Sequence, residues 1–373
     1  MEWKEDILGN VLEVKYGKDH KKLAEGQYPV YGSGGLMRYV DSKLYDGPSI
    51  LIPRKGTLNN IMFVESPFWT VDTMFWTIIN TDKIDPNFLF YSICKRDFAS
   101  MNVGSAVPSM TVRILNDIQI SYPKNLDDQR RIASILSSLD RKIELNNKIN
   151  ADLEEMAQAI FKNWFVDFEP FKDGKFVDSE LGMIPEGWKV GSPYKYVKVV
   201  YGAPYKSAKF NDDGEGLPLI RIRDLKDCKP QFYTPEILPQ TEYVNMGDIV
   251  AGMDAEFVPH IWKGKMGLLN QRVCKLIPQQ TSISNLFVLY LMKPELEFVQ
   301  SYKTGTTVSH LGKADIDKFV VVLPPLEVVE DCSKLLDSIL QRIKNISAES
   351  RTLSLLRDTL LPRLMSGEIE VPE

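Results

Sequence analysis

The sequence predicts a mixed α/β protein in which a globular domain followed by a long helix occurs twice along one chain. The length of 373 residues exceeds that of one typical domain. Short sequence blocks recur in the same order at spacings of about 185 to 201 residues. Two stretches of about 40 residues carry apolar side chains at heptad spacing, which is typical of long paired helices. These observations favour two α+β domains joined by two helices.

The repeat covers nearly the whole chain. The recurring blocks are Trp3-Lys4 with Tyr16-Gly17, which return as Trp188-Lys189 with Tyr201-Gly202, and Gly104-Ser105-Ala106-Val107, which returns as Gly305-Thr306-Thr307-Val308. From Leu126 and Leu326 onward the two copies align without a gap. Chance similarity between two amphipathic helices would explain the last block alone. The shared order of all the blocks indicates a duplicated unit.

Four segments follow from this repeat. We expect globular domains at residues 1–125 and 169–325, and long helices at residues 126–168 and 326–373, the last with a C-terminal tail. Apolar runs bounded by Gly and Pro predict strands at residues 49–52, 74–79, 248–251 and 319–322. Helical patterns occur at residues 87–94 and 286–292. Each globular domain is therefore expected to mix strands and short helices.

The two long helices each carry one apolar seam. Their seam residues alternate at spacings of three and four over four heptads, and those expected to pair are Leu136, Leu139, Ile143, Leu153, Ile160, Leu336, Ile339, Ile343, Leu353 and Leu360. The alternative is two core helices of an ordinary domain. Their length and their charged remaining faces favour pairing, because one such helix cannot bury its seam alone. Asn146 and Asn150 also fall on the seam, where buried amides cost stability and fix the register.

Composition limits the class of protein. No run of 18 or more apolar residues occurs, so no transmembrane helix is expected. Four widely spaced cysteines and the absence of a signal-peptide pattern favour a cytoplasmic protein without disulfides or zinc. The net charge is −5, and it arises from −2 in residues 126–168 and −3 in residues 326–373, since the globular segments balance. Any binding of DNA must therefore use local clusters of Lys and Arg.

Several segments resemble the specificity subunits of type I restriction–modification enzymes. These segments are residues 129–140 (QRRIASILSSLD), 159–171 (AIFKNWFVDFEPF), 179–188 (SELGMIPEGW) and 360–369 (LLPRLMSGEI). They match the start and the end of the first conserved helix, the segment that opens the second recognition domain, and the end of the C-terminal helix. The resemblance covers the whole chain in the order domain, helix, domain, helix.

This resemblance implies a role in DNA recognition. Each globular part would be a target recognition domain that contacts one half of a bipartite site in double-stranded DNA. The helices would pair as an antiparallel coiled coil with pseudo-twofold symmetry and act as a spacer. Two methyltransferase subunits using S-adenosylmethionine would methylate adenines, and restriction subunits using ATP and Mg²⁺ would complete the complex. The chain itself would bind no cofactor and no metal, and it would contribute no catalytic residue.

The residues give no support for catalysis by this chain. No GxxxxGK[ST] loop and no Asn-Pro-Pro-Tyr motif occurs, and the three histidines lack metal-ligand spacing. Asp6 with Glu13-Val14-Lys15 resembles a nuclease pattern that often arises by chance. Residues 32–35 (GSGG) are interpreted as a turn rather than a phosphate-binding loop. Cys94 and Cys274 are interpreted as structural, because no histidine lies near them in a convincing pattern.

Candidate DNA contacts are basic and amide side chains near turns, because these groups read base edges or bind phosphates. The candidates in the first domain are Arg38, Lys43, Arg54, Lys55, Asn59 and Asn60, of which residues 54–60 form the best local cluster. The candidates in the second domain are Lys206, Lys209, Arg221, Arg223, Lys263, Lys265, Gln271 and Arg272, with Tyr205 and Trp262 as aromatic neighbours. Ordinary solvated surface charge is the alternative for each of them. The duplicated Gly104-Ser105 and Gly305-Thr306 are expected to be structural, with a phosphate contact as the alternative.

Two other classes of function remain open from the sequence. A repressor would bind one DNA site tightly without any methyltransferase. An interaction scaffold would show no salt-dependent affinity for DNA.

Overall fold

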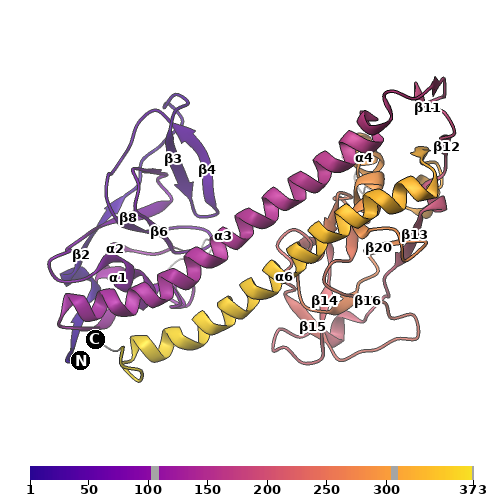
Figure 1. Cartoon of the computed structure of the whole chain (residues 1–373). Coiled ribbons are helices and arrows are strands. Elements are labelled where there is room, and N and C mark those ends of the chain that lie inside the picture. Colours follow the sequence, from indigo (N-terminus) through magenta and orange to yellow (C-terminus); the bar gives the residue numbers. More distant parts are fainter. Residues whose placement is uncertain (102–108, 304–309, 372–373) are drawn as a thin grey trace. The chain divides into compact units, whose positions relative to one another are not determined.

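The computed structural model describes residues 1–101, 109–303 and 310–371, which form two compact units (Figure 1). Unit 1 contains Met1–Ile143 and Thr352–Glu373, and unit 2 contains Glu144–Arg351. Helix α3 (Leu126–Phe165) and helix α6 (Leu326–Met365) each contribute to both units. They begin 200 residues apart and are both 40 residues long, as the gap-free repeat predicts.

Unit 1 contains three small sheets. An antiparallel sheet has the strand order β2-β8-β5-β6, and β1 pairs antiparallel with β9. A mixed sheet has the order β4-β3-β7, in which β3 pairs antiparallel with β4 and parallel with β7. The strands are β1 (Trp3–Ile7), β2 (Leu12–Tyr16), β3 (Tyr28–Gly32), β4 (Gly35–Val40), β5 (Ser49–Pro53), β6 (Met62–Val64), β7 (Trp69–Thr70), β8 (Met74–Ile79) and β9 (Gln119–Pro123). Two short helices accompany them, α1 (Pro86–Ile93) and α2 (Val112–Asn116). Helix α1 begins at Pro86 because the Asp85 side chain accepts a hydrogen bond from the Phe88 amide.

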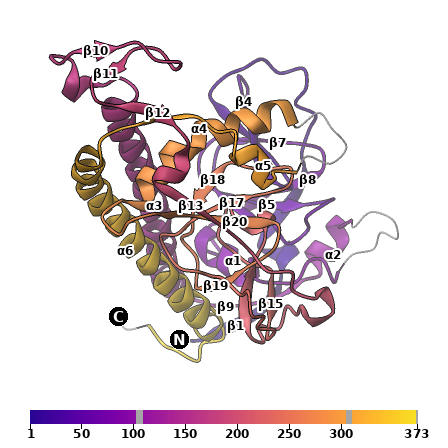
Figure 2. The same ribbon diagram turned by 90° about the vertical axis from the view of Figure 1, so that its right-hand side faces the viewer.

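Unit 2 repeats this arrangement with additions. The sheet β13-β20-β17-β18 corresponds to β2-β8-β5-β6, and the pair β12-β21 corresponds to β1-β9. Helix α4 (Asn285–Lys303) packs against the first of these sheets, and α5 (Lys313–Ile316) follows it (Figure 2). The strands are β10 (Phe176–Val177), β11 (Ile184–Pro185), β12 (Lys189–Gly191), β13 (Val197–Tyr201), β14 (Leu217–Ile220), β15 (Phe232–Thr234), β16 (Tyr243–Val244), β17 (Ile249–Gly252), β18 (Pro259–Ile261), β19 (Gly267–Leu269), β20 (Val273–Pro278) and β21 (Val321–Leu323). Short 3-10 helices lie at Leu8–Asn10, Glu169–Phe171, Pro193–Lys195, Ser207–Lys209 and Ile222–Asp224.

The strand register confirms the duplication. In unit 1, Tyr16 pairs with Phe75 and Ile52 also pairs with Phe75. In unit 2, Tyr201 pairs with Cys274 and Ala251 pairs with the same Cys274. The strands predicted at residues 49–52, 74–79 and 248–251 are therefore the central strands of two equivalent sheets. The strand expected at residues 319–322 begins two residues later, at Val321.

A glycine found in both repeats allows two backbone segments to approach closely at the end of each central sheet. The Gly17 amide donates to the Met74 carbonyl at 3.0 Å, and the Gly202 amide donates to the Val273 carbonyl at 3.2 Å. A Cβ atom on Gly17 would lie 2.0 Å from the Val71 carbonyl oxygen. A Cβ atom on Gly202 would lie 2.2 Å from the equivalent oxygen of Asn270. The Tyr-Gly repeat in the sequence thus marks a close backbone approach.

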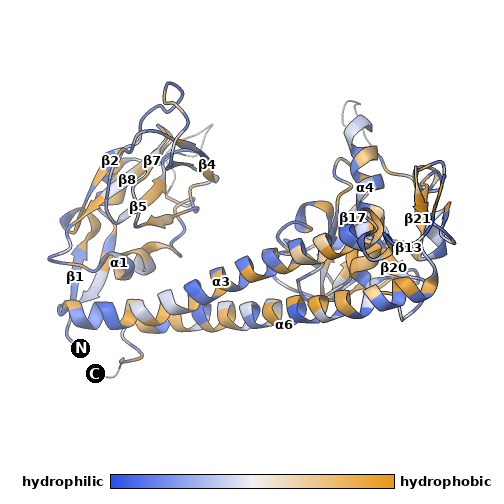
Figure 3. Cartoon of the chain, turned by 45° about the horizontal axis from the view of Figure 1, so that its top comes forward, coloured by the Kyte–Doolittle hydropathy of each residue, from blue (hydrophilic) through white to orange (hydrophobic). Residues whose placement is uncertain are grey.

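The helices α3 and α6 bury their seams within each unit. Figure 3 shows hydrophobic and hydrophilic residues along the whole length of both helices. In unit 1, Leu136 and Leu364 join the core cluster of the globular part. In unit 2, Leu336, Ile339 and Ile343 join a core that also contains α4. The remaining predicted seam residues are buried or half-buried, namely Leu139, Ile143, Leu153, Ile160, Leu353 and Leu360.

Polar contacts on the seam show that the two helices run antiparallel. In unit 2, Asn146 Nδ2 donates to Glu349 Oε2 at 2.8 Å, and Asn150 Nδ2 donates to Ser347 Oγ at 3.1 Å. Residue numbers rise along α3 while those of the partners fall along α6. Both asparagines are buried, so their amides lose hydrogen bonds if the helices slip in register.

Replacing Asn150 with alanine tests this polar layer. We expect Asn150→Ala to lower the free energy of unfolding by about 1–3 kcal/mol, because it leaves the Ser347 hydroxyl buried without this donor. Asn147→Ala is the control, since Asn147 is exposed on the same helix and alanine favours helix. Urea denaturation measures both variants, and equal stability of the two would contradict this role.

Replacing the duplicated glycines tests the equivalence of the two sheets. We expect Gly17→Ala and Gly202→Ala to destabilise the protein by similar amounts, about 1–3 kcal/mol or more, because the new methyl group would overlap a carbonyl oxygen. Gly34→Ala is the control, because a Cβ atom there would have no neighbour within 4 Å. Thermal unfolding should show a lower Tm for the first two variants only.

Candidate nucleic-acid interface

The same backbone frame ends the central strand of each unit. In unit 1 the Arg54 amide donates to the Thr73 carbonyl at 2.8 Å, and the Arg54 carbonyl accepts from the Met110 amide at 2.9 Å. In unit 2 the Met253 amide donates to the Arg272 carbonyl at 2.9 Å, and the Met253 carbonyl accepts from the Leu311 amide at 2.7 Å. We call these two places the strand-end frames. They are equivalent in backbone and differ in side chains.

The left-handed turn that follows each strand end is also shared. Gly56 has φ 87° and Ala255 has φ 60°. Lys55 forms an isolated bridge with Ser109, and Asp254 forms the equivalent bridge with His310. Alanine in the left-handed region is strained, whereas glycine is not. Unit 2 therefore keeps the geometry of the turn without the residue that favours it.

In unit 1 the predicted cluster at residues 54–60 divides into two parts. The guanidinium of Arg54 lies 5.4 Å from the centre of the Tyr16 ring, and Lys55 is exposed. The amides of Asn59 and Asn60 bond within the unit, since the exposed Asn59 donates from Nδ2 to Asp97 and Asn60 Nδ2 donates to the Ser33 carbonyl. The cations are thus available to a ligand, while the amides fasten the loop.

In unit 2 the strand-end frame carries three charged or titratable side chains. Arg272 Nη1 lies 3.0 Å from Asp254 Oδ2, and His310 Nδ1 lies 2.7 Å from Asp254 Oδ1. The Arg272 side chain is 54% exposed, so its remaining N–H donors reach solvent. Gln271, next to Arg272, is exposed as well.

Several other predicted cations form ion pairs within their unit. These pairs are Lys43 with Asp46, Lys209 with Glu236, and Lys263 with Glu154. In the described part of the chain, Lys55, Arg223 and Lys265 are exposed and form no ion pair. Lys206 is exposed, and its backbone amide donates to Glu236.

Two of the predicted DNA contacts, Arg38 and Arg221, are half-buried and interact with groups of their own unit. Arg38 Nη2 donates to the carbonyls of His20 and Leu23, so it fastens the loop before β3. The Arg221 guanidinium stacks on the Phe232 ring at 4.3 Å and lies 3.6 Å from the buried Asp224 carboxylate. Both side chains therefore have partners within their own unit, and their role as DNA contacts stays a prediction.

The two aromatic neighbours expected near DNA are buried. Trp262 has no exposed surface, and its indole N–H donates to the Lys265 carbonyl. Tyr205 is almost fully buried, and its hydroxyl donates to Thr241. The expectation that they stack on sugars or bases is wrong, because both rings fill cores beside β14 and β19. Tyr16 lies beside Arg54 and is exposed, but its place in the repeat was the only signal in the sequence.

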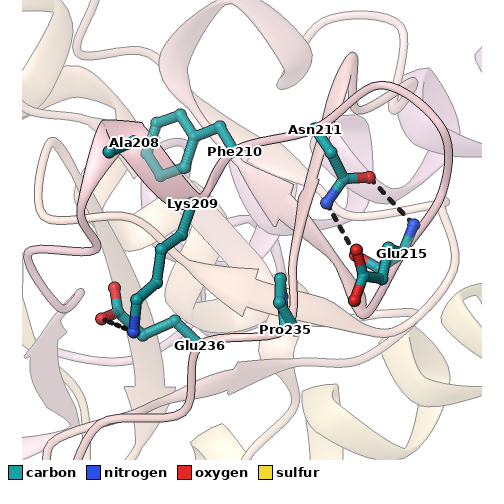
Figure 4. Close-up of a pocket in the computed structure, with 7 residues that line it drawn as sticks. All are labelled: Ala208, Lys209, Phe210, Asn211, Glu215, Pro235 and Glu236. Atoms are coloured by element: carbon teal, nitrogen blue, oxygen red, sulfur yellow. Dashed lines mark hydrogen bonds and ion pairs between the residues drawn. The ribbon is translucent and has the colours of Figure 1, made fainter.

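A pocket of about 430 Å³ lies between two loops of unit 2 (Figure 4). Its lining residues are Ala208, Lys209, Phe210, Asn211, Glu215, Pro235 and Glu236. The polar groups already pair with one another, since Lys209 Nζ lies 2.9 Å from Glu236 and Asn211 makes two hydrogen bonds with the Glu215 backbone. The Lys206 amide and the Lys209 ammonium hold the pKa of Glu236 below its usual range. We assign no ligand to this pocket.

The cysteines, the Asp6 carboxylate and the glycine-rich turn that were weighed for catalysis in the sequence all have surroundings that explain them as structural residues. Burial raises the pKa of the Cys274 thiol to about 12 and that of Cys94 to about 11, so neither is an activated nucleophile. The pKa of Asp6 is well below its usual range, because Lys4 and Asn10 bond to its carboxylate. Residues 32–35 form the turn of the β3–β4 hairpin. In the described ranges, no group of three or more metal-ligating side chains occurs.

Two expectations fall on segments outside the described residues. Gly104-Ser105 and Gly305-Thr306 lie in 102–108 and 304–309.

Among the helices of the described residues, none has the length and apolar character that crossing a membrane requires.

Comparison with known proteins identifies both repeats. The family model described as "Type I restriction modification DNA specificity domain" matches residues 1–155 and again residues 188–353. The MjaIX specificity subunit of Methanocaldococcus jannaschii is 26% identical, over 95% of this chain and 86% of that protein. The HindI specificity subunit of Haemophilus influenzae is 24% identical, over 83% of each. The crystal structure of a type I restriction–modification S subunit from M. genitalium shares the fold, with a TM-score of 0.59, 13% identity, and coverage of 97% of this chain and 96% of that chain.

Arg38 and Lys55 make a matched pair that separates structural from exposed cations. We expect Arg38→Ala to lower the free energy of unfolding by about 1.5–3 kcal/mol, because two carbonyls lose a charged donor. Lys55→Ala should change it by less than about 0.5 kcal/mol, as is usual for an exposed side chain. Urea denaturation of the two variants checks this, and an unchanged stability of Arg38→Ala would contradict the internal role of Arg38.

Proposed function

The chain belongs to the family of type I restriction–modification DNA specificity proteins, and on that premise we propose that it reads a bipartite DNA target, one half-site with each globular part. As a specificity subunit it supplies recognition and no catalysis. The observation that carries this function is the double match of the family model, once over each copy of the duplicated fold. Two equivalent readers in one chain suit a target with two separate half-sites.

The long helices suit a role as spacer and scaffold. Helix α3 continues without interruption from residues of unit 1 into residues of unit 2, and α6 does the same in the opposite chain direction. Met156 and Leu356, which are related by the 200-residue repeat, are both exposed despite their apolar side chains. Apolar residues left exposed at equivalent positions of two helices are suited to docking two copies of one partner.

We propose two kinds of partner subunit, one for methylation and one for restriction. We assign the two equivalent helix positions to two methyltransferase subunits, which would use S-adenosylmethionine to methylate adenines in the N6 position. Restriction subunits, which would use ATP and Mg²⁺, complete the nuclease. The four cysteines are free thiols, which suits assembly in the cytoplasm.

Local cations explain how an acidic chain can bind DNA. The excess negative charge lies in the segments of the two helices, whereas the globular parts are balanced. Exposed cations without ion pairs in the described residues, among them Lys55 and Arg223, supply charge for phosphate contacts. Binding through such contacts releases counterions and weakens steeply as salt concentration rises.

A methylation map tests this function. The chain is expressed with the methyltransferase subunit encoded beside it, and the host genome is sequenced by a method that detects N6-methyladenine. We expect a new methylated motif of two short half-sites separated by a fixed number of unspecified bases. The methyltransferase subunit expressed alone is the control and should give no such motif.

Two negative outcomes would point to the other classes of function. No new methylation, with the complex shown to assemble, would contradict the role as a specificity subunit. Salt-dependent binding of the purified chain to DNA would then favour a repressor, and its absence would favour a scaffold that does not bind DNA.

A further inference from the structure

Each strand-end frame carries one arginine, but on opposite sides of the same hydrogen-bonded residue pair. In unit 1 the pair is Arg54 and Thr73, and the arginine is the residue whose amide donates. In unit 2 the pair is Met253 and Arg272, and the arginine is the residue whose carbonyl accepts. The same backbone frame thus carries an arginine in both units, at Arg54 on the donor strand of unit 1 and at Arg272 on the acceptor strand of unit 2.

Each guanidinium is held by neighbours of its own unit. In unit 1, Arg54 packs on the Tyr16 ring, and its Nη1 donates to the Asp72 carbonyl at 3.3 Å. In unit 2, Arg272 Nη1 is held by Asp254, and His310 in turn contacts the other oxygen of that carboxylate. These contacts restrict the rotamers of a flexible side chain before any ligand binds.

Each arginine keeps donors for a ligand. A guanidinium has five N–H donors, and the contacts described for each arginine engage one nitrogen atom, Nη1. Arginine in such a position matches the two acceptors of a guanine in the major groove, O6 and N7, through two parallel hydrogen bonds. The Met253 side chain opposite Arg272 is buried and so does not compete for the same base.

We propose that Arg54 and Arg272 are specificity-determining residues, each of which reads a guanine in the half-site contacted by its own unit. Tyr16 and Asp254 are positioning residues that orient these two guanidinium groups. This inference rests on the proposed function and deepens it, because it assigns one base contact to each half-site. The negative charge of Asp254 is paired with Arg272, whose Nη1 atom lies 3.0 Å from the carboxylate.

The variants Arg54→Lys and Arg272→Lys test the assignment, because lysine keeps the charge but loses the planar fork. Each variant is purified in complex with the methyltransferase subunit. Methyl transfer is measured on a duplex that carries the mapped wild-type target and on duplexes with each specified base pair changed in turn. The control is Arg130→Lys, an exposed arginine of α3 that pairs with Asp127 and is not among the candidate DNA contacts.

We expect each frame variant to lose discrimination at one G·C pair by roughly tenfold to a hundredfold, the range for one bidentate contact. Arg54→Lys should relax one half-site and Arg272→Lys the other, while Arg130→Lys leaves both unchanged. Asp254→Asn should relax the same position as Arg272→Lys, and to a smaller extent, with the other half-site intact. An effect of Asp254→Asn on stability alone would contradict its positioning role.

Three outcomes would overturn the inference without touching the proposed function. Unchanged discrimination in both variants would show that other residues read the bases. A uniform loss of methylation on all duplexes would assign the arginines to phosphate contacts. Relaxation of the same half-site by both variants would contradict the assignment of one arginine to each half-site. Failure of the wild-type complex to methylate any bipartite motif would instead overturn the proposed function. The Tm of each variant is measured as a folding control, and a value equal to that of the wild type excludes misfolding as the cause of a change.

Discussion

The pairing of α3 with α6 is the contact on which the rest of the structure depends. Each helix carries an apolar seam that it cannot bury alone, and the partner seam is supplied by a segment 200 residues away in the same chain. Both units are therefore built from distant parts of the sequence, and unit 1 needs both ends of the chain. In unit 1 the amino group of Met1 lies 3.4 Å from Glu370, and Trp3 lies against Gly367. Helix pairing thus brings the N-terminal and C-terminal segments of the chain together in unit 1.

Polar residues on and beside the seam give this pairing its register. Burial of apolar surface is not directional, so a purely apolar seam would tolerate sliding by a heptad. Asn146 and Asn150 in unit 2 find partners at one register, and in unit 1 Asp140 accepts hydrogen bonds from both Arg357 and Tyr91. The last contact also ties α1 to the helix pair. In unit 1 the Asp140 carboxylate therefore fixes the helix pair against α1, because a partly buried charge left unpaired would cost stability.

The two globular parts show which features a duplicated reader keeps and which it changes. The glycine at the close strand approach, the left-handed turn and the hydrogen bonds of the strand-end frame are common to both. The side chains on this frame differ in charge and size, with Lys55 in one copy where Asp254 stands in the other. A rigid backbone that presents variable side chains separates folding from recognition, so one part can change without loss of the other.

The sequence alone determined the duplication, the two 40-residue helices, the central strands β5, β8 and β17 and the family resemblance, because these depend on periodicity and motifs that are local in the chain, whereas the central strand β20 was not predicted. It also placed Arg54 and Arg272 among many candidate contacts. Only the tertiary structure showed that these two lie on opposite sides of one shared backbone frame, that Arg38 and Arg221 have partners within their own units, and that Trp262 is buried in a core. The partners that decide these roles are distant in the sequence, as Asp254 and His310 are, or lie on the far side of a turn, as Phe232 does from Arg221. The availability of a charged side chain is set by such contacts, and residue type and spacing do not encode them.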